Sequence, residues 1–541
     1  MPMRSLAAAA ALLLVLHAPS VPVQAQGARP KLVVFLVVDQ MRGDYPERYA
    51  GLLEHGLKRL TTRGAWFKNG AYPYLNTLTC VGHSTIGTGT FPYQHGMIAN
   101  GWWDRKTGKP VTCNSDPDSL EVSYGTSSGT GDSAVRMMKP TLAEVMRSDR
   151  TLKSRVATMS MKARSAIGLA GHKGDFVTWL GEGRGAWETS NAFSTMPVPW
   201  FVGYLKGNPV SEDGDKVWER ALPEARYQYE DDAPGERAGA GWTAKFPHPL
   251  GRAGDGAFVG HWLQSPFPDA YLERMAEAAV AEMKLGTEDR TDFLGVSFSM
   301  LDAVGHAFGP RSHEAQDVLA HLDVTIGRLL DYLDEKVGAG NYVLALSADH
   351  GVAEIPEQVP NAGRIQAPTV RATIEAAAKR ALGGEDSFIA NMSGGEVYFK
   401  PGVYDRLQSA PHGLKEITAL VSAIPGVARV LNRTEISPKS ARKSNDPLIR
   451  AAALSYYPDR SADLTVIPKE HWLMTTSVTT HGTAYSYDQR VPVLLYGAGI
   501  APGVRDDAAT PADLAATIAS MVGVKLPSPD GRVLKSALTK R

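Results

Sequence analysis

The chain has 541 residues, with 57 basic and 57 acidic side chains, so its formal charge at neutral pH is zero. This length allows a large hydrophobic core and more than one domain. A balanced charge gives no electrostatic attraction to nucleic acid or to an anionic membrane. We therefore expect no nucleic-acid-binding module, and we expect anions to be bound only by a few placed side chains.

The first 25 residues have the pattern of a secretory signal peptide. Arg4 precedes an apolar stretch from Leu6 to Leu16, and the small-residue sequence before a cleavage site follows, ending at Ala25. This apolar stretch is too short to span a bilayer. We predict removal of residues 1–25, no membrane anchor afterwards, and a periplasmic or secreted mature chain, 26–541.

Apolar strand-like runs alternate with helical patterns in three blocks, at about 31–175, 291–356 and 481–541. This alternation predicts an α/β fold with a mainly parallel central sheet flanked by helices. Two stretches between the blocks, at about 181–264 and 382–470, have a different composition. Candidate site residues lie on both sides of each stretch. We therefore interpret both as insertions into one domain that form a cap over the active-site edge.

The first predicted strand, Lys31 to Val38, ends at Asp39, which could bind a metal ion or cap a helix. A second candidate is Thr79, within the segment from Leu75 to Gly89. A hydroxyl just before a helix can bind a metal beside an anion that the helix N-terminus favours. A plain helix cap is the commoner role for such a residue.

The chain contains two cysteines, Cys80 and Cys113. In an oxidising compartment the two can form a disulfide, but the sequence equally allows a buried free thiol at Cys80. A cysteine zinc site would need more thiols at closer spacing, so we exclude that class of site.

A basic pair, Lys162 and Arg164, follows a predicted strand from Arg155 to Met159. Such a pair is often solvated surface charge, but it also suits the non-bridging oxygens of a phosphate group. Asn100 could add a neutral donor to the same anion.

Further metal-ligand residues follow later predicted strands. The run from Phe293 to Ser299 leads to Asp302 and His306, and the run from Tyr342 to Ser347 leads to Asp349 and His350. His481 precedes a third apolar run, residues 491–496. Each motif alone is weak. Together at strand ends they predict two neighbouring metal ions, because open α/β sheets place their sites there and carboxylate with imidazole suits Zn²⁺.

With these residues in view, the chain resembles the alkaline phosphatase superfamily, and within it the exported PafA-type alkaline phosphatases, which are related to nucleotide pyrophosphatase/phosphodiesterases. The resemblance extends over nearly the whole mature chain. It is most specific in LTCVGHSTIGTG, HGMIANGWWD, MKAR, LDAVGH, SADHG and THG.

The resemblance implies two Zn²⁺ per chain and a covalent phosphothreonine at Thr79. One zinc would be held by Asp302, His306 and His481, and the other by Asp39, Asp349, His350 and Thr79. Asn100, Lys162 and Arg164 would bind the phosphate oxygens of a phosphate monoester.

The basic pair distinguishes members of this superfamily. Lys162 and Arg164 resemble the monoesterase branch, whereas diesterase relatives lack the pair.

Sulfatases need Cys-x-Pro-Ser-Arg around the nucleophile, but here Val81 and Gly82 follow Cys80. We therefore expect a phosphate monoesterase. A phosphodiesterase or nucleotide pyrophosphatase, and a non-catalytic zinc- or phosphate-binding protein, are the alternatives. The oligomeric state is left open, a monomer being one option.

Overall fold

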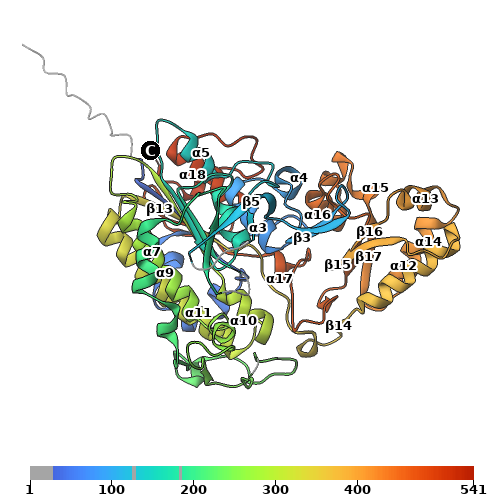
Figure 1. Ribbon diagram of the computed structural model, residues 1–541, viewed down its shortest axis with the longest axis horizontal. Coiled ribbons are helices and arrows are strands. Elements are labelled where there is room, and N and C mark those ends of the chain that lie inside the picture. Colours follow the sequence, from blue (N-terminus) through green and yellow to red (C-terminus); the bar gives the residue numbers. More distant parts are fainter. Residues whose placement is uncertain (1–28, 125–128, 182–184, 240, 541) are drawn as a thin grey trace, which may run out of the picture.

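The computed structural model describes residues 29–124, 129–181, 185–239 and 241–540, so the predicted signal peptide lies outside the described residues. A mixed sheet of 11 strands forms the centre of the molecule (Figure 1). Its strand order is β21-β2-β20-β13-β1-β12-β7-β8-β9-β5-β6. Within the described residues, no helix is long and apolar enough to cross a membrane.

The middle of this sheet is parallel. β1 (Leu32–Val38) lies between β12 (Asp292–Phe298) and β13 (Tyr342–Ser347), and β7 (Val156–Ser160) and β8 (Phe176–Leu180) continue beyond β12. The predicted parallel sheet is confirmed for these five strands. The outer strand β20 (Val493–Gly497) pairs antiparallel with β13, so the sheet as a whole is mixed.

The parallel strands are apolar on both faces because helices cover both. In β1, Leu32, Val34 and Leu36 belong to one hydrophobic cluster, whereas Val33 and Phe35 belong to another. Strands buried on both faces need continuous apolar runs rather than alternation, and this accounts for the pattern in the sequence.

Two helical layers enclose the sheet. One contains α2 (Gly56–Arg63), α9 (Phe267–Glu282) and α11 (His313–Leu333). The other contains α3 (Thr79–Thr88), α5 (Leu142–Ser148), α6 (Ala163–Ala170) and α18 (Ala512–Val522). A π-helical turn, Asp334–Gly338, directly follows α11.

The first predicted insertion packs into the main core. It contributes β9 (Trp187–Ser190) to the central sheet, α7 (Pro199–Gly207), a small hairpin of β10 (Val217–Trp218) with β11 (His248–Pro249), and α8 (Phe258–Trp262). Phe201, Trp218 and Trp262 are buried in the same cluster as the strands.

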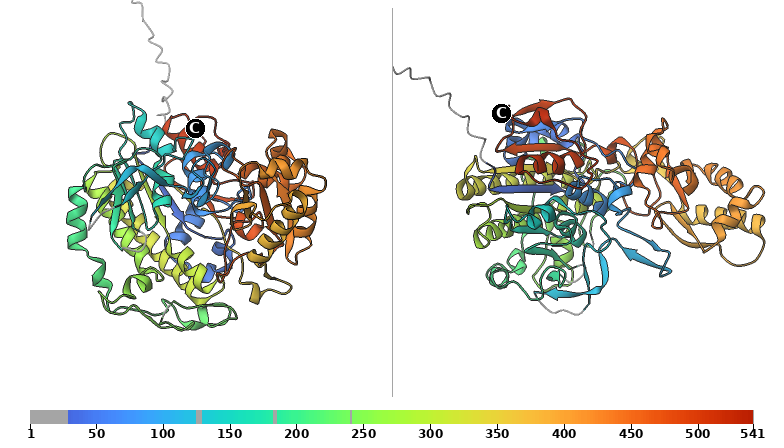
Figure 2. Two further views of the ribbon diagram at one scale, coloured as in Figure 1. Left: turned by 45° about the vertical axis from the view of Figure 1, so that its right-hand side comes forward. Right: turned by 90° about the horizontal axis from the view of Figure 1, so that it is seen from above.

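The second predicted insertion forms a lobe with its own sheet and its own hydrophobic cluster. Its four strands are β15 (Ile389–Ser393), β16 (Glu396–Phe399), β18 (Leu464–Pro468) and β17 (Val427–Asn432), in that order. α12 (Ala367–Leu382), α13 (Val403–Ser409) and α14 (Gly413–Ser422) pack on this sheet. The lobe projects from one side of the main body and is drawn in orange (Figures 1 and 2).

Candidate metal centre and phosphate site

The predicted site residues gather at one edge of the parallel sheet. β1 runs directly into Asp39, and β13 is followed by Asp349 and His350. β12 leads into α10 (Met300–Phe308), which carries Asp302 and His306. Because parallel neighbours end at the same edge, these segments converge although they are far apart in the sequence.

Asp39, Asp349 and His350 form the first cluster of possible metal ligands. One ligand atom from each lies within 4.8 Å of the others, and all three side chains are fully buried. The Asp349 Oδ1 atom accepts hydrogen bonds from the backbone N–H groups of Gln40 and His350, at 3.1 and 3.0 Å. These bonds fix the carboxylate and leave its other oxygen facing the cluster.

Asp302, His306 and His481 form the second cluster, with ligand atoms again within 4.8 Å of one another. His306 and Asp302 are one helical turn apart on α10, so both side chains lie on one face. The ring of His481 stacks on that of His350 with centroids 3.4 Å apart, and so the two clusters adjoin. The family resemblance implied the same two groups.

The hydrogen bonds of the three histidines suit metal coordination. Each Nδ1–H donates to a backbone carbonyl: His306 to Thr479, His350 to Gly351 and His481 to Thr77, at 3.0, 2.9 and 2.8 Å. This leaves each Nε2 lone pair directed at a cluster, as in most histidine metal sites.

Two buried carboxylate oxygens, Asp39 Oδ1 and Asp349 Oδ2, accept no hydrogen bond within the described part of the chain. A buried anionic oxygen without a donor is costly unless a cation is beside it. The donor set of carboxylates and imidazoles, without a thiolate, fits a pair of divalent ions such as Zn²⁺.

Lys162 lies between the two clusters. Its Nζ donates to Asp39 Oδ2 at 2.6 Å and to Asp302 Oδ2 at 2.5 Å. Lys162 is the N-cap residue of α6, just after β7, so its ammonium group lies at the edge where the other parallel strands end. The lysine is therefore part of the site and not solvated surface charge.

Burial and neighbouring charges set the protonation states of this site. Burial, with the carboxylates of Asp302 and Asp349, raises the pKa of Asp39 well above its usual range. Burial opposes ionisation of Asp302 too, but the Lys162 ammonium, together with His306 and His350, outweighs burial and holds that pKa well below the usual range. Burial and the adjacent imidazoles lower the pKa of His481, so its ring is neutral and able to bind a metal.

Thr79 is the first residue of α3 and is almost fully buried. Its Oγ1 lies 3.3 Å from Nε2 of His350, next to the first cluster. A Cβ atom at Gly82 would come within 2.1 Å of the Asp349 carbonyl oxygen, so only glycine allows α3 to approach that segment so closely. The approach places the hydroxyl beside the ligands, at a helix N-terminus that favours an anion.

A disulfide joins Cys80 to Cys113, which decides the question the sequence left open. Asn100 lies between the two cysteines: the backbone N–H of Cys80 donates to Asn100 Oδ1 at 2.8 Å, and that of Cys113 donates to the Asn100 carbonyl at 3.0 Å. Because Oδ1 is occupied, the amide nitrogen remains as the donor for an anion.

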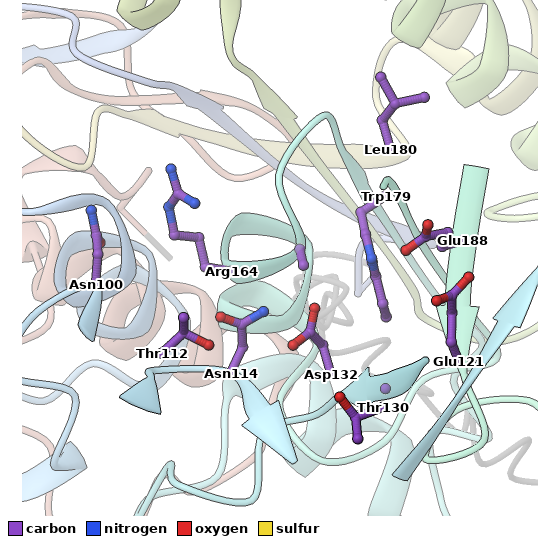
Figure 3. Close-up of a pocket in the computed structure, with 12 residues that line it drawn as sticks. Asn100, Thr112, Asn114, Glu121, Thr130, Asp132, Arg164, Trp179, Leu180 and Glu188 are labelled. Atoms are coloured by element: carbon purple, nitrogen blue, oxygen red, sulfur yellow. The ribbon is translucent and has the colours of Figure 1, made fainter. Parts of the chain in front are cut away.

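Asn100 and Arg164 both line a cavity of about 240 Å³. Figure 3 shows the two side chains at one end of this cavity, and Trp179, Glu121 and Glu188 at the other. Arg164 is on α6, two residues after Lys162, so one short helix supplies both cations of the predicted phosphate site.

Two residues that the sequence analysis gave no role contribute to the site. Gln40 donates through Nε2 to Asp302 Oδ1 at 2.7 Å and through its backbone N–H to Asp349, so it links both clusters. His83 Nδ1 donates to the Thr79 carbonyl at 2.9 Å and lies 3.3 Å from Asp349 Oδ2. Their positions, next to Asp39 and one helical turn after Thr79, were the available signals.

Comparisons with known proteins agree with this geometry. A family model described as "Type I phosphodiesterase / nucleotide pyrophosphatase" matches residues 33–489. The alkaline phosphatase PafA of Elizabethkingia meningoseptica is 32% identical over 517 residues, covering 92% of this chain and 93% of that protein. The alkaline phosphatase PhoV of Synechococcus elongatus is 30% identical over 520 residues, covering 94% and 93%.

Solved structures point the same way. The crystal structure of wild-type alkaline phosphatase PafA superimposes with a TM-score of 0.86 at 30% identity, covering 95% of this chain and 99% of that one. Murine ectonucleotide pyrophosphatase/phosphodiesterase 5 has a TM-score of 0.52 at 13% identity and shares the fold alone. The chain therefore belongs to the type I phosphodiesterase/nucleotide pyrophosphatase family, and within it the chain is an alkaline phosphatase of the PafA type.

Proposed function

We propose that this alkaline phosphatase is an exported enzyme that hydrolyses phosphate monoesters through a covalent phosphothreonine at Thr79, with two zinc ions per chain. The observation that carries the proposal is the position of the Thr79 hydroxyl, at the N-terminus of α3 and 3.3 Å from His350 Nε2. Export is supported by the signal-like residues 1–25 and by the disulfide.

The residues of each cluster would hold one ion. Asp39, Asp349 and His350, with Thr79, surround one position, and Asp302, His306 and His481 surround the other. Bound zinc would act as a Lewis acid that lowers the pKa of the attacking hydroxyl and stabilises the leaving oxygen.

The protein's own groups would direct the transfer. Thr79 Oγ1 loses its proton and forms a bond to phosphorus while the bond to the ester oxygen breaks, and the leaving alkoxide takes up a proton. Water then hydrolyses the phosphothreonine and releases inorganic phosphate. Asn100, Lys162 and Arg164 bind the non-bridging oxygens, whose charge distribution changes in the transition state.

The cation arrangement favours monoesters over diesters. A monoester dianion carries more charge on its free oxygens, so Lys162 and Arg164 attract it more strongly. The family model includes phosphodiesterases, so a diesterase is the second candidate. Comparing p-nitrophenyl phosphate with its bis ester separates the two, and a higher kcat/KM for the bis ester would reject the monoesterase proposal.

The decisive variant is Thr79→Ala. It removes the proposed nucleophile but none of the six carboxylates and imidazoles of the two clusters, so we expect monoester turnover to fall by at least about a thousandfold while bound zinc, measured by elemental analysis, is retained. Thr79→Ser should recover part of the activity, and Thr88→Ala, at the other end of the same helix, should keep it. Full activity in Thr79→Ala would exclude Thr79 as the nucleophile.

We also propose that both insertions belong to one catalytic domain, 26–541, and cover the active-site edge. The support is that the second insertion and the site line a common cavity.

A further inference from the structure

A second cavity, of about 380 Å³, lies between the main body and the lobe formed by the second insertion. On the main-body side it is lined by Leu78, Trp102 and His481, and on the lobe side by Ser393, Glu396 and Thr465. Figure 1 places β3 (Gly101–Asp104) and α17 (Ser486–Gln489) next to this lobe. Its volume falls within the range of about 300–1,000 Å³ that is typical of small-molecule sites.

This cavity adjoins the predicted phosphate site. Asn100 lines both it and the cavity that contains Arg164. His481, a member of the Asp302 cluster, contributes to its wall, and Leu78 directly precedes Thr79.

The geometry of phosphoryl transfer fixes which part of a substrate enters the cavity. The attacking and leaving oxygens lie roughly in line across phosphorus. With Thr79 beside the first cluster, the leaving oxygen faces the Asp302 cluster, and the group attached to it extends past His481. The cavity is therefore on the leaving-group side.

The aromatic part of the wall is rigid. Trp472 donates from Nε1 to the Asn361 carbonyl at 3.0 Å, and its ring occupies the space where a side chain at Gly363 or Gly426 would lie. Trp102 and Tyr398 add two further aromatic side chains that are almost fully buried. Fixed aromatic walls bind planar rings at a low cost in side-chain entropy.

The polar part of the wall offers hydrogen bonds but no cation. Asn391, Glu396 and Thr465 line it, and Thr465 Oγ1 donates to Glu396 Oε1 at 3.3 Å. Burial raises the pKa of Glu396 to about 7, so near neutral pH this carboxyl group can donate as well as accept. Among the described residues that line the cavity there is no lysine or arginine, which disfavours leaving groups with further phosphates.

On the basis of the proposed monoesterase function, we propose that this cavity is a leaving-group subsite that selects monoesters with an uncharged, planar aromatic group of nucleoside size. The aromatic walls contact the ring, and Asn391, Glu396 and Thr465 bind its polar edge. A leaving alcohol without a ring leaves the cavity unfilled and gains no binding free energy from contacts with its wall.

The test compares substrates that differ only in the ring. AMP and ribose 5-phosphate share a primary ester oxygen on the same sugar, so a difference between them reports the base. We expect kcat/KM for AMP to exceed that for ribose 5-phosphate by about tenfold or more. We also expect adenosine, which has no phosphate, to inhibit competitively.

Ser393→Trp supplies the matched variant. Ser393 is exposed at the end of β15 and lines the cavity, so a tryptophan there fills the cavity without disturbing a packed core. We expect kcat/KM for AMP to fall about tenfold and inhibition by adenosine to weaken, while ribose 5-phosphate changes by less than about twofold. Ser409→Trp, on the exposed face of α13 in the same lobe, is the control and should leave both substrates unchanged.

The outcomes separate this proposal from the one on which it rests. If the parent protein hydrolyses neither ribose 5-phosphate nor p-nitrophenyl phosphate, the monoesterase proposal fails. If it hydrolyses both but shows no advantage for AMP, or if Ser393→Trp affects AMP and ribose 5-phosphate equally, the leaving-group subsite is rejected.

Discussion

At the scale of single residues, the site depends on hydrogen bonds that orient potential ligands. Three histidines each donate Nδ1–H to a backbone carbonyl, and Gln40 holds one carboxylate from each cluster. Such contacts fix the tautomer and the ring direction before a metal arrives. A ligand set that is already oriented needs little reorganisation when metal and substrate bind.

Lys162 is the residue whose charge we expect to matter most for substrate choice. Lys162→Met keeps most of the volume but removes the ammonium group that contacts Asp39 and Asp302. We expect kcat/KM for p-nitrophenyl phosphate to fall by about a hundredfold or more, because a dianion loses a buried cationic partner. The bis ester, with a single negative charge, should lose less.

The measurement is the ratio of the two kcat/KM values in the parent and in the variant. Lys206→Met, at an exposed position on α7, is the matched control and should leave the ratio unchanged. An equal loss for monoester and diester would show that Lys162 acts on the site as a whole and does not discriminate between substrates.

At the scale of secondary-structure elements, close packing of α3 brings the proposed nucleophile to the strand ends. All ten residues of this helix are buried, and Gly82 allows contact with the Asp349 segment. The disulfide at Cys80 then ties the start of α3 to the end of the hairpin formed by β3 and β4 (Lys109–Thr112). Asn100 consequently lies within the loop that the disulfide closes, and Thr79 directly precedes this loop.

Removing this disulfide should affect both stability and catalysis. The cysteines are 33 residues apart, and for a loop of that length the chain-entropy model gives a loss of about 3–4 kcal/mol in the Cys80→Ala/Cys113→Ala variant. We also expect a lower kcat/KM, because Asn100 is bonded to the backbone of both cysteines. Denaturant unfolding and monoester kinetics measure the two effects.

A double-mutant cycle distinguishes a specific role of Asn100 from general loosening. If the disulfide acts through Asn100, its removal should cost less activity in an Asn100→Ala background than in the parent protein. An equal loss of kcat/KM in both backgrounds would mean that the disulfide stabilises the fold without positioning Asn100.

At the scale of the whole molecule, the two clusters connect segments that are far apart in the chain. Their six side chains come from the ends of β1 and β13, from α10 and from the segment before β20, and three of them are buried carboxylates. Lys162 offsets only part of this negative charge. Two divalent ions would neutralise the remainder and link the segments.

Metal removal should therefore destabilise the fold as well as abolish activity. A ligand that binds only the folded state at about a hundred times its Kd adds about 2.7 kcal/mol per site to the free energy of unfolding. We expect a chelator to lower the melting temperature measured by calorimetry, and added Zn²⁺ to restore it. In Asp302→Asn, which weakens one cluster, the chelator should cause a smaller shift. An unchanged melting temperature after metal loss would contradict a structural role of the ions.

The sequence was sufficient to predict the central elements because their physical signals are local. Strands buried on both faces need continuous apolar runs, and β13 has the limits that its run predicted, Tyr342 to Ser347. Polar residues that follow such runs in a parallel sheet meet at one edge, which is why Asp39, Asp302 and Asp349 were expected near one another. The division into two ligand groups came from the family resemblance.

Other features depend on contacts that sequence spacing does not encode. The pairing of Cys80 with Cys113, the bonds from Gln40 to both clusters and the position of Lys162 between Asp39 and Asp302 require the folded backbone. The cavity between the lobe and His481 likewise exists only once a segment with its own core packs beside the site. The sequence by itself determined which residues offer metal-binding chemistry, and it predicted Asn100, Lys162 and Arg164 as phosphate contacts. The tertiary structure decided their distances, their hydrogen-bonded partners and the cavity next to them, because these depend on packing between segments hundreds of residues apart.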